Sequence, residues 1–308
     1  MRVERYTTHV GGLENASLAY AAWGELNAAG DNAVLLPSYY TGTHECYAPL
    51  IGQGRVLDPA RYFIVAPNLF GNGVSTSPSH GGVFPRLTIE DNVHAQHDLL
   101  RHLGVRSLAL AAGWSMGAMQ ALHWAMLYPA MVRNVAAVCG TAFCWPINAA
   151  FLAGIAPILT EVPEPLSQDL FGRAYCGWAY SAEFFRAALY RNLGFSSLAG
   201  LYDDWAVDHQ AHRAADLLAV LQAWADTARV PEDARAALAR ITARCFILPC
   251  DTDAYFTVAD AAFEAGCIAN ATLLPLASPY GHCAGAPGRF ANESACIEEV
   301  FIQALEEA

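Results

Sequence analysis

Short apolar runs and longer segments with helical spacing follow one another along the chain. The apolar runs have the length and the flanking turn residues of buried strands; they lie at residues 17–23, 32–40, 62–67, 108–112, 132–141, 244–249 and 272–276. Helix-forming segments lie between or after them, at residues 88–103, after residue 117 and at residues 293–305. Because strands that alternate with helices join through right-handed crossovers, the pattern predicts an α/β fold with a mostly parallel central sheet flanked by helices.

The alternation stops between residues 145 and 238. This block contains helix-like segments rich in alanine, leucine and aromatic residues, at 147–159, 167–192 and 212–227. The chain then returns directly to an apolar run that the sheet still needs. We therefore expect a helical cap or lid insertion at residues 145–238, with residues 1–144 and 239–308 as the core. A second independent domain is the alternative.

Composition narrows the class of protein. Hydrophobic residues make up 55% of the chain and charged residues 15%, which is typical of a globular protein with a large core. The formal charge is -12, and no cluster of basic residues stands out, so we expect neither nucleic acid nor a membrane surface as a partner. The first 12 residues lack the apolar run of a secretory signal, which predicts a cytoplasmic protein. The nine cysteines, with no C-x-x-C pair, are then reduced thiols.

Residues 113–117, Gly-Trp-Ser-Met-Gly, lie where an apolar run meets a helix-forming segment. This strand, sharp turn and helix order is that of a nucleophile elbow, with Ser115 as the nucleophile. A Cβ two residues before or after the serine would collide with its surroundings, which explains the flanking glycines. The first free N–H groups of the new helix face the nucleophile, so Met116 N–H is a candidate oxyanion-hole donor. The alternative is a chance pattern in a chain with 24 glycines.

A serine hydroxyl needs a base, and the base needs an acid that orients it. In the α/β-hydrolase fold the chain order is serine, acid, histidine. His282 lies in a loop after the last predicted strand, where it would be the base; the alternative is a loop histidine without a role. Asp251 and Asp253 both follow the strand at 244–249, and their spacing does not decide which one is the acid.

Two further segments border this predicted site. Residues 38–42, Ser-Tyr-Tyr-Thr-Gly, follow an early strand at the position of the second oxyanion-hole loop, and we expect the backbone N–H of Tyr40 to be the donor. The alternative is that Tyr40 only packs over the loop. The segment at 68–82 has loop composition throughout, and we expect it to border the site as well.

The helix predicted at residues 88–103 starts with a capping box formed by Thr88 and Asp91. Asp91, His94 and Asp98 fall on one face of it and have the residue types of a metal site. A helix with its polar face in water has the same pattern, so we expect no metal here.

Four stretches of the sequence resemble the homoserine O-acetyltransferase family of α/β hydrolases, which also includes esterases; they are LAYAAWGELNAAGDNAVLLPSYYTGTH, FPRLTIEDNVHAQHDLLRHLGV, GWSMGAMQALHWAMLYPAMV and SPYGHCAG. The similarity spans residues 17–141 and 244–285. It implies an α/β-hydrolase fold, a catalytic triad of Ser115, Asp253 and His282, and an oxyanion residue at Tyr40. Asp251 is then a loop-capping carboxylate.

The chain departs from the family pattern in two places. The family's oxyanion loop begins His-x-Leu-Thr-Gly, whereas residues 38–42 here are bulkier and more aromatic. The family's cap carries an arginine that holds the amino-acid substrate, and Arg186, Arg191 and Arg213 of this cap lie in no matching motif.

These observations predict a serine hydrolase that cleaves a small carboxylic ester through an acyl-enzyme. One alternative is an acyl-CoA-dependent O-acetyltransferase that acts on a homoserine-like or other small alcohol; another is a non-catalytic receptor that binds a small ligand. We expect no cofactor. The expected partner is a small-molecule acyl ester or acyl-CoA, and a homodimer is left open.

Overall fold

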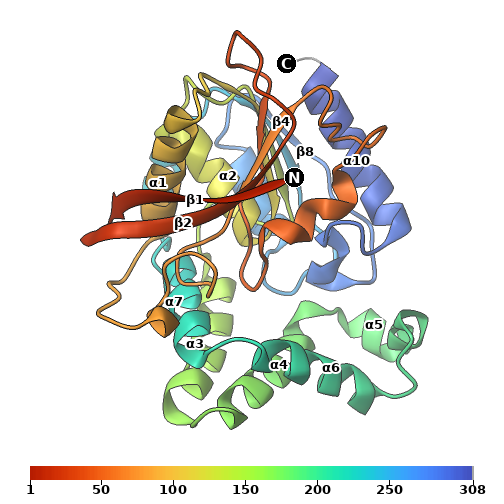
Figure 1. Ribbon diagram of the computed structural model, residues 1–308. Helices are drawn as coiled ribbons and strands as arrows, with labels where there is room; N and C mark the ends of the chain where they lie inside the picture. The colour runs from red at the N-terminus through yellow and green to blue at the C-terminus, as the bar shows by residue number, and fades with distance from the viewer. Residues whose placement is uncertain (307–308) are drawn as a thin grey trace.

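The computed structural model describes residues 1–306, which form an eight-stranded sheet with helices on both faces (Figure 1). The strand order is β1-β2-β4-β3-β5-β6-β7-β8. The strands are β1 Arg2–Val10, β2 Leu13–Trp23, β3 Ala33–Leu35, β4 Phe63–Pro67, β5 Leu108–Trp114, β6 Asn134–Val138, β7 Arg244–Leu248 and β8 Ala271–Leu273. The strands from β3 to β8 pair in parallel, and β1 and β2 are antiparallel. The predicted fold class is therefore confirmed.

Alternate residues of the central strands enter two separate hydrophobic layers. In β3, Ala33 and Leu35 belong to the layer that packs under α1 (Ile89–His102) and α2 (Met116–Leu127). Val34 belongs to the layer on the other face, which is covered by α10 (Ala291–Glu306). Because both faces of a parallel sheet are covered, its strands are apolar at every position, and this explains the continuous apolar runs in the sequence.

The first helix begins as the sequence predicts. The Thr88 hydroxyl accepts a hydrogen bond from Asp91 N at 3.0 Å, and the Asp91 carboxylate accepts one from Thr88 N at 2.8 Å. This reciprocal pair is a capping box, and it satisfies two N–H groups that the first turn leaves free. No helix within residues 1–306 is long and apolar enough to cross a membrane.

The strand predicted at 32–40 is much shorter in the structure. β3 ends at Leu35, although Ser38 N still donates to Pro67 O at 3.0 Å. Pro37 has no N–H to add to the ladder, so regular pairing stops there. The chain then turns toward α2, in which Gln120 Nε2 donates to Ser38 O at 2.8 Å. This short strand places residues 38–42 beside Ser115.

The helices between β6 and β7 lie together beyond one end of the sheet (Figure 1). They are α3 Pro146–Glu161, α4 Leu166–Ala179, α5 Ala182–Arg186, α6 Leu198–Gln210, α7 Ala214–Ala225 and α8 Pro231–Leu238, with a 3₁₀ turn, η3, at Leu189–Leu193. The single helix predicted at 167–192 is wrong, because Ser181 starts a new helix by accepting a hydrogen bond from Phe184 N at 3.0 Å. We propose that residues 145–238 form a cap on the core.

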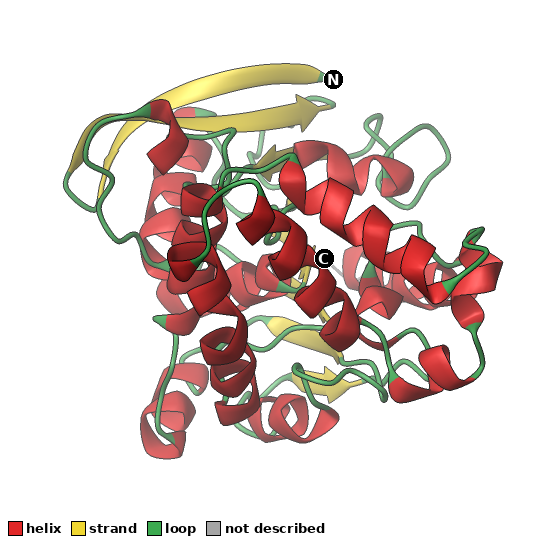
Figure 2. Ribbon diagram, turned by 90° about the horizontal axis from the view of Figure 1, so that it is seen from below, coloured by secondary structure: helices red, strands yellow, loops and turns green. Residues whose placement is uncertain are grey.

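The remaining elements are short and belong to the part of the chain outside residues 145–238. They are the 3₁₀ turns η1 His44–Leu50, η2 Pro78–His80 and η4 Gly281–Gly285, and the helix α9 Val258–Ala265. Figure 2, seen from below, shows the cap helices in front of the sheet. The loops at the ends of β3, β5, β7 and β8 therefore meet the cap, and the candidate site is built there.

Candidate active site

Ser115 occupies a strained turn between β5 and α2. Its φ is 59° and its ψ is -125°, a backbone conformation that few residues other than glycine adopt. The surrounding backbone holds it there: Ser115 N donates to Val138 O at 2.9 Å, and Ser115 O accepts from Met119 N at 3.1 Å. The Ser115 side chain makes no capping hydrogen bond to the helix. Its hydroxyl is therefore free for chemistry.

The two glycines of the motif are required by close contacts. A Cβ on Gly113 would lie 2.4 Å from the carbonyl carbon of Gly117. A Cβ on Gly117 would lie 2.6 Å from both Pro37 O and the Tyr47 hydroxyl. Backbone atoms cannot move aside as a flexible side chain can, so both positions need glycine. The steric reason predicted from the sequence is confirmed.

His282 is held by Asp253. The distance from His282 Nδ1 to Asp253 Oδ2 is 2.6 Å, and both side chains are buried. The other carboxylate oxygen, Oδ1, accepts hydrogen bonds from the N–H groups of Tyr255 and Phe256, each at 3.0 Å. An ionised carboxylate only accepts, so His282 Nδ1 carries a hydrogen and Nε2 is left with a lone pair. The histidine is thus fixed in the tautomer that a general base needs.

Asp251 has a different environment. Its side chain is exposed, and its Oδ1 accepts a hydrogen bond from Ser278 N at 3.0 Å. It therefore holds the loop that leads to His282 but does not bond to that histidine. The spacing of the two aspartates left open which one contacts the histidine. In the folded structure Asp253 bonds to His282 and Asp251 does not.

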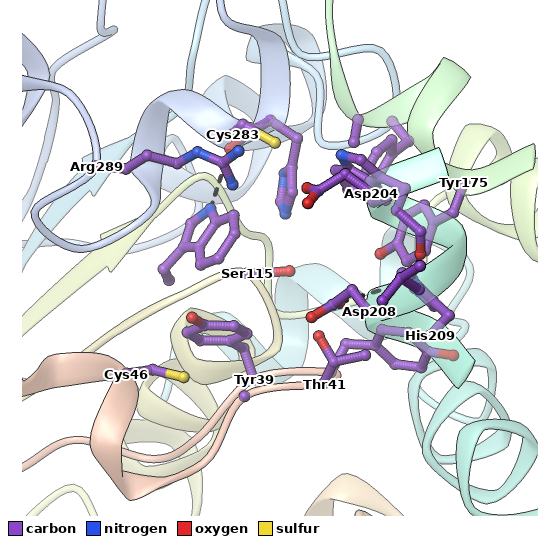
Figure 3. Close-up of a pocket in the computed structure, with 18 residues that line it drawn as sticks. Tyr39, Thr41, Cys46, Ser115, Tyr175, Asp204, Asp208, His209, Cys283 and Arg289 are labelled. Carbon is purple, nitrogen blue, oxygen red and sulfur yellow. Dashed lines mark hydrogen bonds and ion pairs between the residues drawn. The ribbon is translucent and has the colours of Figure 1, made fainter. Parts of the chain in front are cut away.

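Ser115 and His282 line one cavity of about 470 Å³. Figure 3 shows Ser115 near its centre, with Tyr39 and Thr41 below and Asp204 and Asp208 of α6 opposite. The core thus supplies one wall and the cap supplies the other. No local sequence pattern marks the α6 residues, because they reach the cavity only through the packing of a helix that is distant from Ser115 along the chain.

Of the two predicted oxyanion residues, Tyr40 lines this cavity, and Met116 directly follows Ser115, which lines it. Met116 is the first residue of α2, where a backbone N–H has no partner within the helix. Tyr40 lines the cavity, and its buried ring packs on Phe171 and Tyr175 at centroid distances of 6.2 and 5.5 Å. The ring of Tyr40 therefore has the packing role named as its alternative, while the role of its backbone N–H remains a proposal.

The loop at 68–82 supports residues 38–42 from behind. Leu69 N donates to the Ser38 hydroxyl at 2.9 Å, and Asn72 Nδ2 donates to Gly42 O at 3.3 Å. No residue of 68–82 lines the cavity, so the prediction that this loop borders the site is wrong. Residues 39–42 line the cavity instead.

No cap arginine lines the cavity. Arg213 pairs with Glu164 at 2.8 Å, and Arg186 lies 3.8 Å from Glu183. The arginine that does line it is Arg289, from the loop before α10; its Nη2 donates to the Tyr180 hydroxyl at 2.8 Å. Arg289 belongs to no motif and lies outside the cap, so no sequence pattern points to it.

The polar face of α1 has other contacts than a metal. Asp91 caps the helix, His94 Nδ1 lies 2.6 Å from the Tyr128 hydroxyl, and Asp98 Oδ1 lies 3.6 Å from His97 Nδ1. Within the described part of the chain, no group of three or more histidine, cysteine, aspartate or glutamate side chains has the arrangement of a metal site.

Comparison with known proteins identifies the family. The family model that describes the α/β hydrolase fold matches residues 34–175 of this chain. An ethyl acetate hydrolase from Pseudomonas veronii is 35% identical, in a match that covers 92% of this chain and 87% of that enzyme. The structure of the acetyl esterase MekB has a TM-score of 0.93 at 30% identity and covers 99% of this chain and 97% of its own. A homoserine O-acetyltransferase from Nostoc punctiforme is 41% identical over 151 residues, which cover 44% of this chain and 42% of that enzyme.

The esterase matches extend over nearly the whole chain, cap included, whereas the acetyltransferase match covers less than half of it. The resemblance stated from the sequence is thus confirmed. The chain belongs to the α/β-hydrolase family, among its esterases and homoserine O-acetyltransferases, and it is an enzyme of the esterase or acyltransferase type.

Proposed function

We propose that the protein hydrolyses a small carboxylic ester, with Ser115 as nucleophile, His282 as general base and acid, and Asp253 as the residue that orients the histidine. The observation that carries this proposal is the 2.6 Å bond between His282 Nδ1 and Asp253 Oδ2, in the cavity where the strained Ser115 lies. A buried carboxylate that fixes the histidine tautomer is what a serine nucleophile requires of its base.

The first half of the reaction forms an acyl-enzyme. Ser115 Oγ bonds to the ester carbonyl carbon while its proton passes to His282 Nε2, and the carbonyl oxygen becomes an oxyanion. The N–H groups of Met116 and Tyr40 are the donors we propose for that oxyanion. The bond to the alcohol oxygen then breaks, and His282 gives its proton to the departing alcohol.

In the second half, water releases the acyl group. His282 removes a proton from the water, whose oxygen bonds to the acyl carbon. The bond to Ser115 Oγ breaks, the serine regains its proton and a carboxylic acid leaves. Asp253 stabilises the imidazolium in both halves and keeps its own negative charge.

The charges around the cavity support hydrolysis over transfer from acyl-CoA. Asp204 and Asp208 project from the exposed face of α6 into the cavity, and the cavity-lining residues include one arginine, Arg289 (Figure 3). Phosphate groups of an acyl-CoA would approach these carboxylates in a protein whose formal charge is already -12. The full-length relatives, which are named as ester hydrolases, point the same way.

A two-substrate assay tests the proposal. The enzyme is incubated with p-nitrophenyl acetate, and separately with acetyl-CoA plus homoserine or serine, while p-nitrophenol and free thiol are followed. We expect ester cleavage that does not depend on an acceptor. Thiol release that requires the amino acid and yields its O-acetyl ester would contradict hydrolysis and support the transferase.

A further inference from the structure

Buried polar side chains line the inner part of the cavity, and the proposed reaction does not use their side-chain groups. They are Tyr175 of α4, His209 of α6 and Tyr255 from the loop before α9, and each is at most 5% exposed. We call these three residues the polar wall. In Figure 3 the Tyr175 hydroxyl points into the cavity, and His209 lies on the cap side. Apolar side chains would fill such a wall if it only had to exclude water.

The hydrogen bonds of His209 define what it can bind. Its Nδ1 lies 2.8 Å from the carbonyl oxygen of Trp205, which can only accept, so Nδ1 carries the hydrogen. Burial lowers the pKa of His209, which keeps the ring neutral and leaves a lone pair on Nε2. Nε2 is buried and has no hydrogen-bond partner among the described residues. A ligand that satisfies it must therefore donate a hydrogen bond.

The hydroxyl of Tyr255 in the polar wall is also unsatisfied. Tyr255 Oη is buried and makes no hydrogen bond of acceptable geometry within residues 1–306. The Tyr175 hydroxyl lies close enough to interact with it electrostatically. A buried polar atom without a partner is unfavourable, and natural proteins contain few of them. Two such groups on one cavity wall, His209 Nε2 and Tyr255 Oη, indicate that a polar part of the substrate binds there.

The position of the polar wall shows which part of the substrate meets it. The Tyr255 ring packs against the His282 ring, with 4.6 Å between their centroids. Tyr175 is the next ring, 6.1 Å from Tyr255, and His209 follows at 6.0 Å from Tyr175. The wall thus extends from His282 into the cap. Because His282 protonates the departing alcohol, the alcohol part of the ester lies on this side.

We propose that the polar wall binds a hydroxyl group on the alcohol part of the ester, so that the preferred substrates are monoesters of short diols or polyols. This inference rests on the proposed ester hydrolysis. A hydroxyl donates to His209 Nε2 and at the same time accepts from a tyrosine O–H. An ammonium group can only donate, and an alkyl group can do neither. A site built to bind a hydroxyl discriminates strongly against the analogue that lacks it.

The test compares 2-hydroxyethyl acetate with propyl acetate, in which a methyl replaces the terminal hydroxyl. We expect the wild-type kcat/KM to be at least about tenfold higher for the hydroxylated ester. His209→Asn keeps a donor near the Nδ1 position and removes Nε2, and Tyr175→Phe removes one hydroxyl. Both variants should bring the ratio of the two kcat/KM values toward one. His209→Gln, which restores a polar group near Nε2, should recover part of the ratio.

Tyr202→Phe is the matched control, because Tyr202 also lies on a cap helix but does not line the cavity; it should keep the wild-type ratio. The ratio is measured within each protein, so a partly unfolded variant still reports it. A wild-type ratio near one, or a ratio that neither variant changes, overturns the inference while ester hydrolysis stands. If the enzyme cleaves neither these esters nor p-nitrophenyl acetate, the proposed function fails and the inference fails with it.

Discussion

Glu264 accepts a hydrogen bond of 2.6 Å from the backbone N–H of Ala142, in the segment that connects β6 to the first cap helix. Its other oxygen accepts from Phe143 N at 3.1 Å and from the Trp145 indole N–H at 2.9 Å. On the opposite side of the same peptide segment, His123 Nε2 donates to Ala142 O at 2.9 Å. Two buried titratable groups therefore hold the connection between core and cap.

Because of Glu264, we expect the free energy of unfolding to fall as the pH rises. Burial raises its pKa from 4.5 to about 7. Between pH 4.5 and pH 7 the folded protein keeps a proton on Glu264 that the unfolded chain releases. The contribution of this proton to the free energy of unfolding is fully present below pH 4.5 and is lost as the pH rises toward 7. The loss is at most about 1.4 kcal/mol per pH unit. Glu264→Gln cannot titrate. Urea unfolding of both proteins between pH 4.5 and 7.5 should show the wild type losing stability relative to the variant; parallel curves would contradict this.

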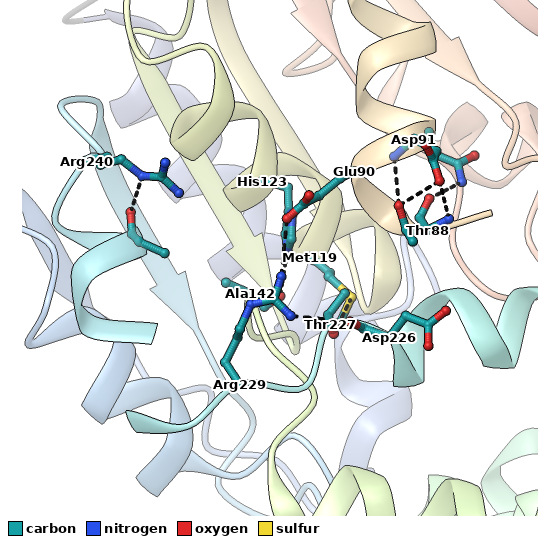
Figure 4. A network of polar contacts seen from close by, with 12 residues as sticks. Thr88, Glu90, Asp91, Met119, His123, Ala142, Asp226, Thr227, Arg229 and Arg240 are labelled. Atoms are coloured by element: carbon teal, nitrogen blue, oxygen red, sulfur yellow. Dashed lines mark hydrogen bonds and ion pairs between the residues drawn. The ribbon is translucent and has the colours of Figure 1, made fainter. Parts of the chain in front are cut away.

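Because of His123, we expect the free energy of unfolding to fall as the pH is lowered, which is the opposite pH dependence. Burial lowers its pKa from 6.5 to about 4, and Figure 4 shows it between Ala142 and Glu90. Below pH 6.5 the unfolded chain binds a proton at this histidine, whereas the folded protein does not. The free energy of unfolding therefore decreases as the pH falls from 6.5 to 4. His123→Gln keeps a donor for Ala142 O and removes the titration, so its unfolding free energy should fall less on acidification. The exposed His9→Gln is the control and should behave as the wild type.

The motif glycines give a steric prediction. Gly117→Ala would place a methyl 2.6 Å from Pro37 O, and the backbone would have to shift, at a cost of about 1–3 kcal/mol of stability. Activity should fall as well, because the shift moves the Ser115 turn. Gly154→Ala is the matched control. Nothing lies within 4 Å of its added Cβ, and in the exposed middle of α3 alanine should stabilise by up to about 1 kcal/mol. Thermal unfolding of the two variants should therefore shift in opposite directions.

The sequence predicts those parts of the site that depend on local patterns. The motif around Ser115 requires glycines two residues on either side, and chain order directs attention to His282. The first follows from chemistry within a few residues, and the second follows from the order of the triad along the chain. Asp204 and Arg289 reach the cavity only because distant segments pack together, so no local pattern marks them.

The difference between local patterns and distant packing also explains which strands and helices are visible in the sequence. The apolar strands are buried on both faces and are visible in the sequence, whereas β1 is not. Seven of its nine residues are not buried, because it is an edge strand that pairs only with β2. Without a buried face, its sequence lacks the apolar pattern of the other strands. The helix α6 is likewise weakly patterned: Leu201, Ala206 and His209 are its buried residues.

The two aspartates give a prediction about orientation. Asp253→Asn should lower kcat by about 10³–10⁴-fold, because the amide can no longer hold His282 in the reactive tautomer. Asp251→Asn keeps an oxygen that can accept from Ser278 N and has no contact with His282, so its kcat should stay within a fewfold of wild type. Both variants are assayed with the same ester across pH 6 to 9. A larger loss in Asp251→Asn would move the acid to that residue.

Ser115 gives the prediction on which the mechanism depends. Ser115→Ala removes the only atom that forms the covalent bond, and kcat should fall by about three or more orders of magnitude. Its unfolding midpoint should not fall, because the Ser115 hydroxyl makes no capping bond and alanine fits the same space. A fluorophosphonate probe should label the wild type and the control Ser107→Ala, in which a serine that does not line the cavity is replaced, but not Ser115→Ala. Because the backbone is strained at this position with φ of 59°, the serine is held there for its chemistry rather than for stability. Near-normal turnover by a folded, unlabelled Ser115→Ala protein would show that the reaction does not pass through an acyl-serine at this position, and another nucleophile would then have to be sought.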